Sequence, residues 1–413
     1  MTAPERRCLL SVLVLAAAVA QAADWPQWRG PMRDGVAPCT ECPDTLPAEL
    51  KPAWSVEVGE GYSGPVVTGG KVVVLSRQGD DEVLQCLDAS NGKALWLDTW
   101  AAPYKPQSVA KRHGRGPFAT PAIDDGRVYS LGIRGALSCH DLANGKRLWR
   151  HDFADKFKKS HPTWGAAGSP LVEGRMVIVN VGTRGDGGLA AFDCGSGAQV
   201  WQQTADGAAY CSPVAADLGG QRQVVCLMYS HTVGLAAASG KLLWKSPFIV
   251  KYEQNIITPV IAGGQVVISG WRQPATAYRI GDGGAQATVA WQNKAESMFM
   301  SSPVTDGKHL FGLADRGKGS LVCLDAASGR TLWTSPGGIG EYASIVRAAD
   351  KLLVLAANGE LRLVAASPSE YKELGKVRLT TRPTWAHLAV ADGCLFVKDK
   401  THLSCFALPG LKK

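Results

Sequence analysis

The 413-residue sequence has no apolar run long enough to cross a membrane. Its longest run of this kind, Cys8 to Ala20, has 13 residues, whereas a spanning helix needs about 20. Lys/Arg-rich runs are also missing, because the 44 basic and 36 acidic residues are spread along the chain. These absences argue against a transmembrane segment and against a nucleic-acid-binding surface.

Common catalytic signatures are absent as well. The sequence contains no His-Glu-x-x-His, no Gly-x-Ser-x-Gly and no Gly-Lys followed by Ser or Thr. These patterns mark zinc proteases, α/β-hydrolases and nucleotide-binding P-loops, so none of these sites is expected. The histidines do not have the spacing of metal ligands, and we expect no metal site.

The first residues predict a signal peptide. Arg6 and Arg7 precede the apolar run, which ends in Ala-Gln-Ala at residues 20–22, a small-x-small cleavage pattern. We expect residues 1–22 to be removed and the protein to be periplasmic or extracellular. Cys8 begins the apolar run instead of following it, so no lipid anchor is expected there.

One string recurs at the end of successive blocks of the chain. It has the form Ala/Cys-x-Asp-x-x-x-Gly-Lys-x-x-Trp, with looser copies. Each block opens with small-x-Pro, or with an equivalent without the proline, and the eight openings lie 42 to 56 residues apart. This is the period of a four-stranded propeller blade. The strings end at Trp96, Trp149, Trp201, Trp244, Trp291 and Trp333.

The blocks predict an all-β, eight-bladed propeller with four antiparallel strands per blade. Short apolar segments alternate with turns such as Asn144-Gly145, which supply the positive φ of tight hairpins. The last block has no terminal tryptophan, and an early strand carrying Trp54 should fill that place and close the ring. Each tryptophan should dock its blade onto the next. The expected divisions are 23–50 for an N-terminal extension, 51–409 for the propeller and 410–413 for a tail.

The recurring string is similar to the tryptophan-docking motif of pyrroloquinoline-quinone (PQQ)-like repeat propellers, the quinoprotein alcohol dehydrogenase-like superfamily. The opening Trp-Pro-Gln-Trp-Arg-Gly-Pro at residues 25–31 resembles the start of a set of secreted bacterial propellers. The enzymes of the superfamily use a quinone, calcium, a catalytic aspartate and adjacent cysteines, and this chain has no Cys-Cys pair. The resemblance therefore implies the non-catalytic branch, which includes the propeller lipoprotein of outer-membrane assembly, although the lipid-anchor cysteine of that protein is lacking.

Superposing the eight blocks predicts two rings of residues on one face. The residues shortly before the first strand of each blade should surround the mouth of the central channel, and seven of the eight are aromatic. They are Tyr62, Phe118, Trp164, Tyr210, Asn255, Phe299, Tyr342 and Trp385. The loops between second and third strands should open on the same face, and they carry Arg77, Arg134, Arg184, His231, Arg272, Arg316, Asn358 and Lys400.

Aromatic rings and cations around one mouth suit a flat or anionic ligand, such as a sugar acid, a quinone or an acidic peptide. Two long loops, 101–116 and 153–164, should lie on this face, where His113, His161, His231 and His387 could meet. The alternative is that the aromatic residues brace the loops and the cations only solvate the rim.

The cysteines fall into two groups. Cys86, Cys139, Cys323 and Cys405 occupy equivalent strand positions and are predicted to be buried thiols. Cys39 and Cys42 lie in the extension, where an oxidising compartment favours a disulfide between them.

The sequence therefore predicts a secreted, monomeric, non-catalytic binding or scaffold protein. Its partner should be a protein or a glycan, and no cofactor is expected. The alternative is a quinoprotein-type oxidoreductase with PQQ and calcium, or a polysaccharide-processing enzyme.

Overall fold

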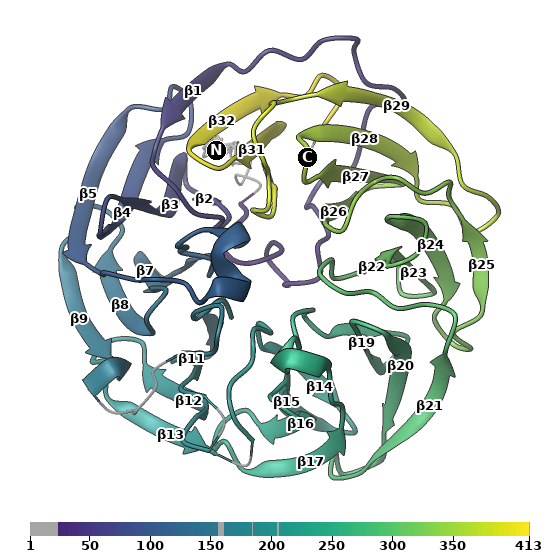
Figure 1. The fold of residues 1–413 in the computed structure, drawn as a ribbon, viewed down its shortest axis with the longest axis horizontal. Helices are drawn as coiled ribbons and strands as arrows, with labels where there is room; N and C mark the ends of the chain where they lie inside the picture. The colour runs from purple at the N-terminus through teal and green to yellow at the C-terminus, as the bar shows by residue number, and fades with distance from the viewer. Residues whose placement is uncertain (1–23, 156–160, 184, 205, 413) are drawn as a thin grey trace, which may run out of the picture.

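The computed structural model describes residues 24–155, 161–183, 185–204 and 206–412, which form an eight-bladed β-propeller (Figure 1). Eight antiparallel sheets of four strands surround a central channel. The predicted fold class is therefore confirmed, whereas the predicted signal peptide, 1–22, lies outside the described residues.

The strands follow one another from the channel outwards in each blade. Blade 1 consists of β2 (Val66–Thr68), β3 (Lys71–Gln78), β4 (Asp81–Asp88) and β5 (Ala94–Ala101), and blade 2 of β6 (Ala122–Asp124), β7 (Arg127–Leu131), β8 (Ala136–Asp141) and β9 (Arg147–Asp152). Blade 3 consists of β10 (Leu171–Glu173), β11 (Met176–Val181), β12 (Gly188–Asp193) and β13 (Gln199–Gln203), and blade 4 of β14 (Val214–Leu218), β15 (Gln221–Leu227), β16 (His231–Ala236) and β17 (Leu242–Pro247).

Blade 5 consists of β18 (Val260–Ala262), β19 (Gln265–Gly270), β20 (Gln273–Ile280) and β21 (Ala287–Asn293), and blade 6 of β22 (Val304–Thr305), β23 (His309–Ala314), β24 (Ser320–Asp325) and β25 (Thr331–Thr334). Blade 7 consists of β26 (Ala343–Ala348), β27 (Lys351–Ala356), β28 (Glu360–Ala365) and β29 (Glu373–Arg378), and blade 8 of β30 (Ala389–Ala391), β31 (Cys394–Lys398), β32 (His402–Ala407) and β1 (Trp54–Glu57). The 3-10 helices η1 (Ser108–His113), η2 (Phe153–Asp155) and η3 (Lys251–Glu253) lie in the connections between blades.

The two ends of the chain close the ring together. Strand β1 pairs antiparallel with β32, with Trp54 opposite Cys405, and completes blade 8 from the opposite end of the sequence. The predicted closure by an early strand is confirmed.

The tryptophans dock neighbouring blades as the repeat predicts. Trp96 is 9% exposed, and its indole Nε1 donates to the carbonyl of Leu142 in blade 2 at 2.9 Å. A Cβ atom on Gly145 would lie 2.6 Å from Cδ2 of Trp96, so only glycine lets this turn cover the indole face. The pairs Trp54–Gly92, Trp149–Gly197, Trp201–Gly240 and Trp291–Gly329 repeat this contact.

Trp244 and Trp333 are held differently. The Trp244 indole donates to Oε1 of Gln223 in its own blade at 2.7 Å, and the Gln223 amide donates to the carbonyl of Gly284 in blade 5 at 3.0 Å. The Trp333 indole donates to the carbonyl of Ser367 in blade 7 at 2.7 Å. All seven docking tryptophans are thus linked to the next blade. Five pack against a glycine of that blade, whereas Trp333 is linked by a hydrogen bond and Trp244 by a hydrogen bond through Gln223.

The small-x-Pro motif is a second link between blades. Its middle residue is often Ser or Thr, and the side-chain oxygen accepts a backbone N–H from the preceding blade. Thr120 accepts from Gly64 at 3.0 Å, and Ser169 accepts from Thr120 at 2.9 Å. Ser212 accepts from Ser169 at 2.9 Å, so the link repeats around the channel. The motif therefore satisfies buried backbone donors that a sheet edge would leave unpaired.

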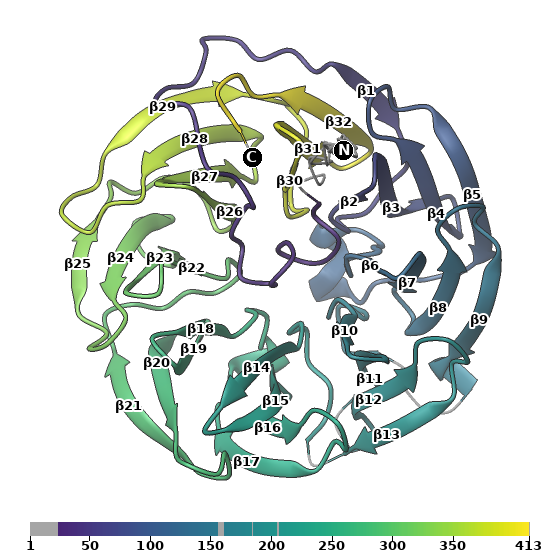
Figure 2. The same cartoon turned by 180° about the vertical axis from the view of Figure 1, so that it is seen from behind.

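The N-terminal extension crosses the channel. Residues 24–37, in purple, run through the centre of the ring and lie in front in Figure 2. The backbone of Trp25 pairs with Val67 of blade 1 at 2.8 and 2.9 Å, and Ala37 donates to Arg347 of blade 7 at 2.8 Å. Arg33 is fully buried and donates to the carbonyls of Ser169 and Pro170 in blade 3 at 3.1 and 2.8 Å. This segment closes one end of the channel, which makes the other end a pocket.

The cysteines agree with one prediction and not with the other. Cys86, Cys139, Cys323 and Cys405 are buried thiols, as predicted. Cys39 and Cys42 are half-buried free thiols, so the predicted disulfide between them is not present in the structure. Each packs against the core of the last blades, which shields it partly from solvent.

Candidate functional site

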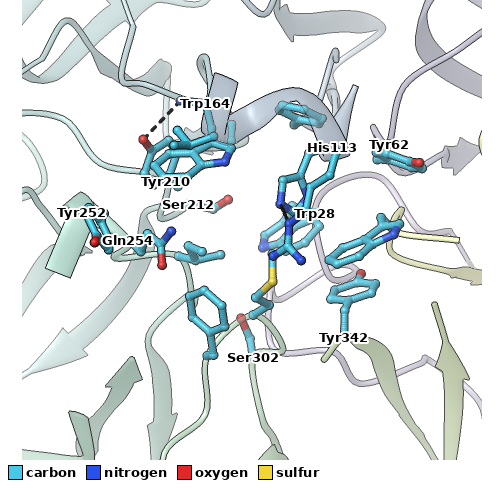
Figure 3. Close-up of a pocket in the computed structure, with 18 residues that line it drawn as sticks. Trp28, Tyr62, His113, Trp164, Tyr210, Ser212, Tyr252, Gln254, Ser302 and Tyr342 are labelled. Atoms are coloured by element: carbon cyan, nitrogen blue, oxygen red, sulfur yellow. Dashed lines mark hydrogen bonds between the residues drawn. The ribbon is translucent and has the colours of Figure 1, made fainter. Parts of the chain in front are cut away.

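A pocket of about 500 Å³ occupies the open end of the central channel (Figure 3). It is lined mainly by aromatic side chains from the segments that precede the first strand of each blade. These are Tyr62, Phe118, Trp164, Tyr210, Tyr252, Phe299, Tyr342 and Trp385, and Trp28 of the extension joins them. All seven aromatic residues of the predicted ring therefore meet in one cavity.

One wall of the pocket is a row of neighbouring rings from blades 7, 8, 1 and 2. Tyr342 and Trp385 stack with centroids 5.4 Å apart and planes 11° apart. Trp385 contacts Tyr62 at 6.4 Å, and Tyr62 is parallel to Phe118 at 6.4 Å. The opposite wall includes Trp164 and Tyr210, which meet edge to face at 5.8 Å. The rings hold one another in place, so the walls are preorganised.

Trp28 forms the floor. Its indole Nε1 donates to Oγ1 of Thr258 at 2.8 Å, and its ring meets His387 edge to face at 5.1 Å. His387 is buried against Trp25 and Trp28 and does not line the pocket. Burial, together with the nearby Arg29 guanidinium, lowers the pKa of His387 to about 3. The predicted role of His387 as a ligand contact is therefore corrected to support of the floor.

The helix η1 covers part of the mouth, in front of the channel in Figure 1. It comes from the predicted long loop 101–116 and contributes Val109, Arg112 and His113 to the lining. Both Nη atoms of Arg112 bind Glu341 in the segment before blade 7, at 3.2 and 3.4 Å. This ion pair joins two sides of the mouth. Burial lowers the pKa of His113, so its imidazole is biased towards the neutral form.

The structure does not bring the predicted cations into a ring, and this part of the prediction is wrong. The Arg77 side chain is fully buried between blades 1 and 2, 3.7 Å from the carboxylate of Glu82. Glu82 lies directly opposite Arg77 in the β3–β4 hairpin and also accepts from the backbone of Ile133 in blade 2 at 2.6 Å. Arg77 is thus a structural residue. Arg134 does not line the pocket, and Arg184 lies outside the described residues.

Asn255 and the remaining histidines are also placed away from the ligand space. The buried Asn255 amide donates to the carbonyls of Met228 and Phe248 at 2.6 and 3.2 Å and braces the loop whose Gln254 and Ile256 line the pocket. His231 binds Asp206 at 3.1 Å, and the ring of His161 meets Tyr104 at 5.4 Å. The four predicted histidines therefore do not meet.

A second cavity of about 480 Å³ lies between blades 5 and 6. Trp271, Arg272, Ser297, Asp315 and Arg316 are among its lining residues. Trp271 also contacts two rings of the central pocket, Phe299 at 6.1 Å and Tyr252 at 6.4 Å, so the two cavities share one aromatic wall. Arg272 and Arg316, predicted as members of a cation ring, belong to this separate cavity.

Sequence reasoning missed several lining residues. Trp28 is in the Trp-Pro-Gln-Trp string of the extension, but its place depends on contact with Thr258, 230 residues away. In blade 5 the aromatic ring that lines the pocket comes from Tyr252. It lies three residues before Asn255, the residue predicted for this position by superposing the blocks. The signal for this residue in the sequence was an aromatic side chain near the expected position, without a fixed distance from the first strand of the blade.

The chain matches one family model, described as outer membrane protein assembly factor BamB, over residues 80–335. It is 23% identical to the outer membrane protein assembly factor BamB of Yersinia pestis, over 66% of this chain and 73% of that protein. It is 24% identical to the quinohemoprotein alcohol dehydrogenase ADH-IIG of Pseudomonas putida, over 74% of this chain. The match spans only 37% of that dehydrogenase.

Solved structures show the same fold at low sequence identity. The quinohemoprotein alcohol dehydrogenase from Comamonas testosteroni superposes with a TM-score of 0.69 at 14% identity, covering 95% of this chain and 81% of that one. BamB from Moraxella catarrhalis superposes with a TM-score of 0.61 at 15% identity, covering 87% of this chain and 99% of that one. Within the described part of the chain, no helix has the length and apolar character required to span a membrane.

Proposed function

The chain belongs to the family described as outer membrane protein assembly factor BamB, and on that premise we propose that it is a non-catalytic binding protein that takes a protein or glycan partner through its central pocket. We place this activity after export, in the periplasm or outside the cell. The predicted signal peptide and the names of the matching outer-membrane assembly factors support that location.

The exposure of the aromatic rings inside the pocket carries the proposal. Rings that only braced loops would be buried on all sides, whereas Trp28, Trp164 and Trp385 are half-buried and face a shared cavity. The cavity volume is within the range of sites for small ligands and inserted side chains. The hydroxyls of Ser212 and Ser302 and the amide of Gln254 supply a few polar contacts among the apolar ones.

A quinone with calcium does not fit the residues that line the pocket. A calcium site needs several oxygen ligands, chiefly carboxylates. No carboxylate is among the residues that line the pocket, and the described residues contain no group of three or more His, Cys, Asp or Glu side chains that could hold a metal ion. Arg112, the one lining arginine, is already paired with Glu341. We therefore assign no oxidation step to this chain.

We expect ligands of the pocket to stabilise the wild-type protein but not a variant that lacks the aromatic rings of Trp164 and Trp385. Saccharides, N-acetylated aromatic amino-acid amides and PQQ with calcium chloride are tested by thermal shift against wild type and the Trp164→Ala/Trp385→Ala variant. A ligand at 100 times its Kd stabilises the folded state by about 2.7 kcal/mol, a shift of roughly 2 to 5 °C.

The Trp164→Phe/Trp385→Phe variant is the matched control, because it keeps two aromatic faces and should retain most of the shift. Equal shifts in wild type and the alanine variant would exclude the pocket as the binding site. A PQQ-dependent shift that also requires calcium would favour the quinoprotein alternative.

A further inference from the structure

The second cavity has the composition of a site for a polar, uncharged ligand. Its cations are balanced locally, because Nη2 of Arg316 binds Oε1 of the buried Glu296 at 2.7 Å and Arg272 lies near Asp315. The central pocket is balanced in the same way, since Arg112 is paired with Glu341. Acidic and basic groups are thus equal in number around each cavity, which favours neither a strongly acidic nor a strongly basic ligand.

The turn that carries Trp271 and Arg272 is conformationally costly. These two residues join β19 to β20, because Gly270 pairs with Gln273. Arg272 has φ +55°, a left-handed conformation that glycine or asparagine adopts more easily. Ser297 holds the turn by accepting from the backbone N–H of Arg272 at 2.9 Å and donating to the carbonyl of Gly270 at 2.8 Å.

The strained turn places a stacked pair at the boundary between the cavities. The Arg272 guanidinium lies 4.9 Å from the centroid of the Trp271 ring, and Trp271 contacts Phe299 of the central pocket. Folding does not require an arginine at a left-handed position in an exposed turn.

We infer, on the basis of the proposed function, that the ligand is an uncharged oligosaccharide. It would extend from the central pocket past Phe299 and Trp271 into the cavity between blades 5 and 6. A pyranose ring has apolar faces that stack on aromatic rings, and its hydroxyls point outwards in the ring plane. The walls of the central pocket provide the aromatic faces. Arg272, Asp315 and Arg316 provide charged donors and acceptors for hydroxyls, which bind more strongly than neutral groups.

The side-chain hydroxyls at the floor fit the same ligand. The Ser302 oxygen accepts from the backbone of Thr258 at 2.9 Å and the Ser212 oxygen accepts from Ser169 at 2.9 Å. Each hydroxyl proton then remains to be donated, and both side chains line the pocket. A sugar hydroxyl, which both donates and accepts, is a suitable partner.

The test compares chain lengths. Titration calorimetry measures the binding of two-ring and six-ring oligosaccharides of glucose, mannose, galactose and N-acetylglucosamine to wild type, Trp271→Ala and Trp271→Phe. For one of these series we expect the six-ring chain to bind at least tenfold more tightly than the two-ring chain. Trp271→Ala should remove this tenfold advantage, because it should lower the six-ring affinity much more than the two-ring affinity, which depends on Trp271 only through its contacts with Phe299 and Tyr252. Trp271→Phe should keep most of the advantage.

A second variant separates ligand contact from folding. Arg272→Gly relieves the left-handed strain, so its melting temperature should equal or exceed that of wild type, while its six-ring affinity should fall several-fold. A melting temperature that falls together with the affinity would show that Arg272 is a structural residue and would overturn its assignment as a ligand contact.

Each remaining outcome decides between the two proposals. Saccharide binding that needs Trp385 but shows no dependence on length or on Trp271 overturns the extended ligand and leaves the proposed function intact. Binding of N-acetylated aromatic amides in the pocket, with no saccharide binding, overturns the glycan and favours a protein partner. If no probe binds in a way that depends on Trp164 and Trp385, both proposals fail.

Discussion

Replacing Trp96 by alanine is expected to lower the free energy of unfolding by about 3 to 5 kcal/mol. The indole is buried between blades 1 and 2, lies against Gly145 and donates to the carbonyl of Leu142. Alanine would leave a cavity at this contact and an acceptor without its partner. Equilibrium unfolding in urea, followed by circular dichroism, measures the loss.

The matched control for this variant is the neighbouring residue Leu95. It lies on the same strand, β5, but is 49% exposed, so Leu95→Ala should change the free energy of unfolding by less than about 0.5 kcal/mol. Trp149→Ala and Trp333→Ala should resemble Trp96→Ala. A loss below about 1 kcal/mol in all three would show that the tryptophans do not hold the blades together.

Acid is expected to destabilise the protein through His387. Its pKa is lowered from 6.5 to about 3 by burial and by Arg29, so the unfolded chain binds a proton between these pH values and the folded chain does not. The stabilising contribution is complete above pH 6.5 and is lost as the pH falls towards 3. At 1.36 kcal/mol per pKa unit, the loss over this shift is on the order of 5 kcal/mol.

The slope of stability against pH tests this expectation. In His387→Gln the free energy of unfolding should depend less on pH between 3 and 6.5, by about 1.4 kcal/mol per pH unit, whatever the variant costs at neutral pH. An unchanged slope would mean that another group causes the acid sensitivity.

The repeat predicts the fold because each blade repeats the same local contacts. Trp96 and Gly145 lie in consecutive copies of one string, and their contact recurs from blade to blade. The same regularity predicts the aromatic wall, since Tyr62, Phe118 and Trp385 occupy equivalent positions. Repeats that follow one another in the sequence lie side by side around the channel, so equivalent residues of different blades meet at its mouth.

Residues outside this regularity could not be placed from the sequence. The role of Arg77 depends on Glu82 and on the buried space between two blades, which the repeat does not describe. The role of Trp28 depends on the path of the extension across the channel. Position in a repeat predicts where a backbone segment lies, but not whether a charged side chain points to solvent or to a buried partner.

The central claim is that the aromatic pocket binds the partner, and a crystal structure with a ligand that stabilises the wild-type protein tests it most directly. We predict electron density for the ligand above Trp28, between Trp164 and Trp385, and for a long oligosaccharide continuing to Trp271. Density on the outer strands, for example beside the exposed Leu95 and Leu97, with none in the central pocket, would contradict the claim.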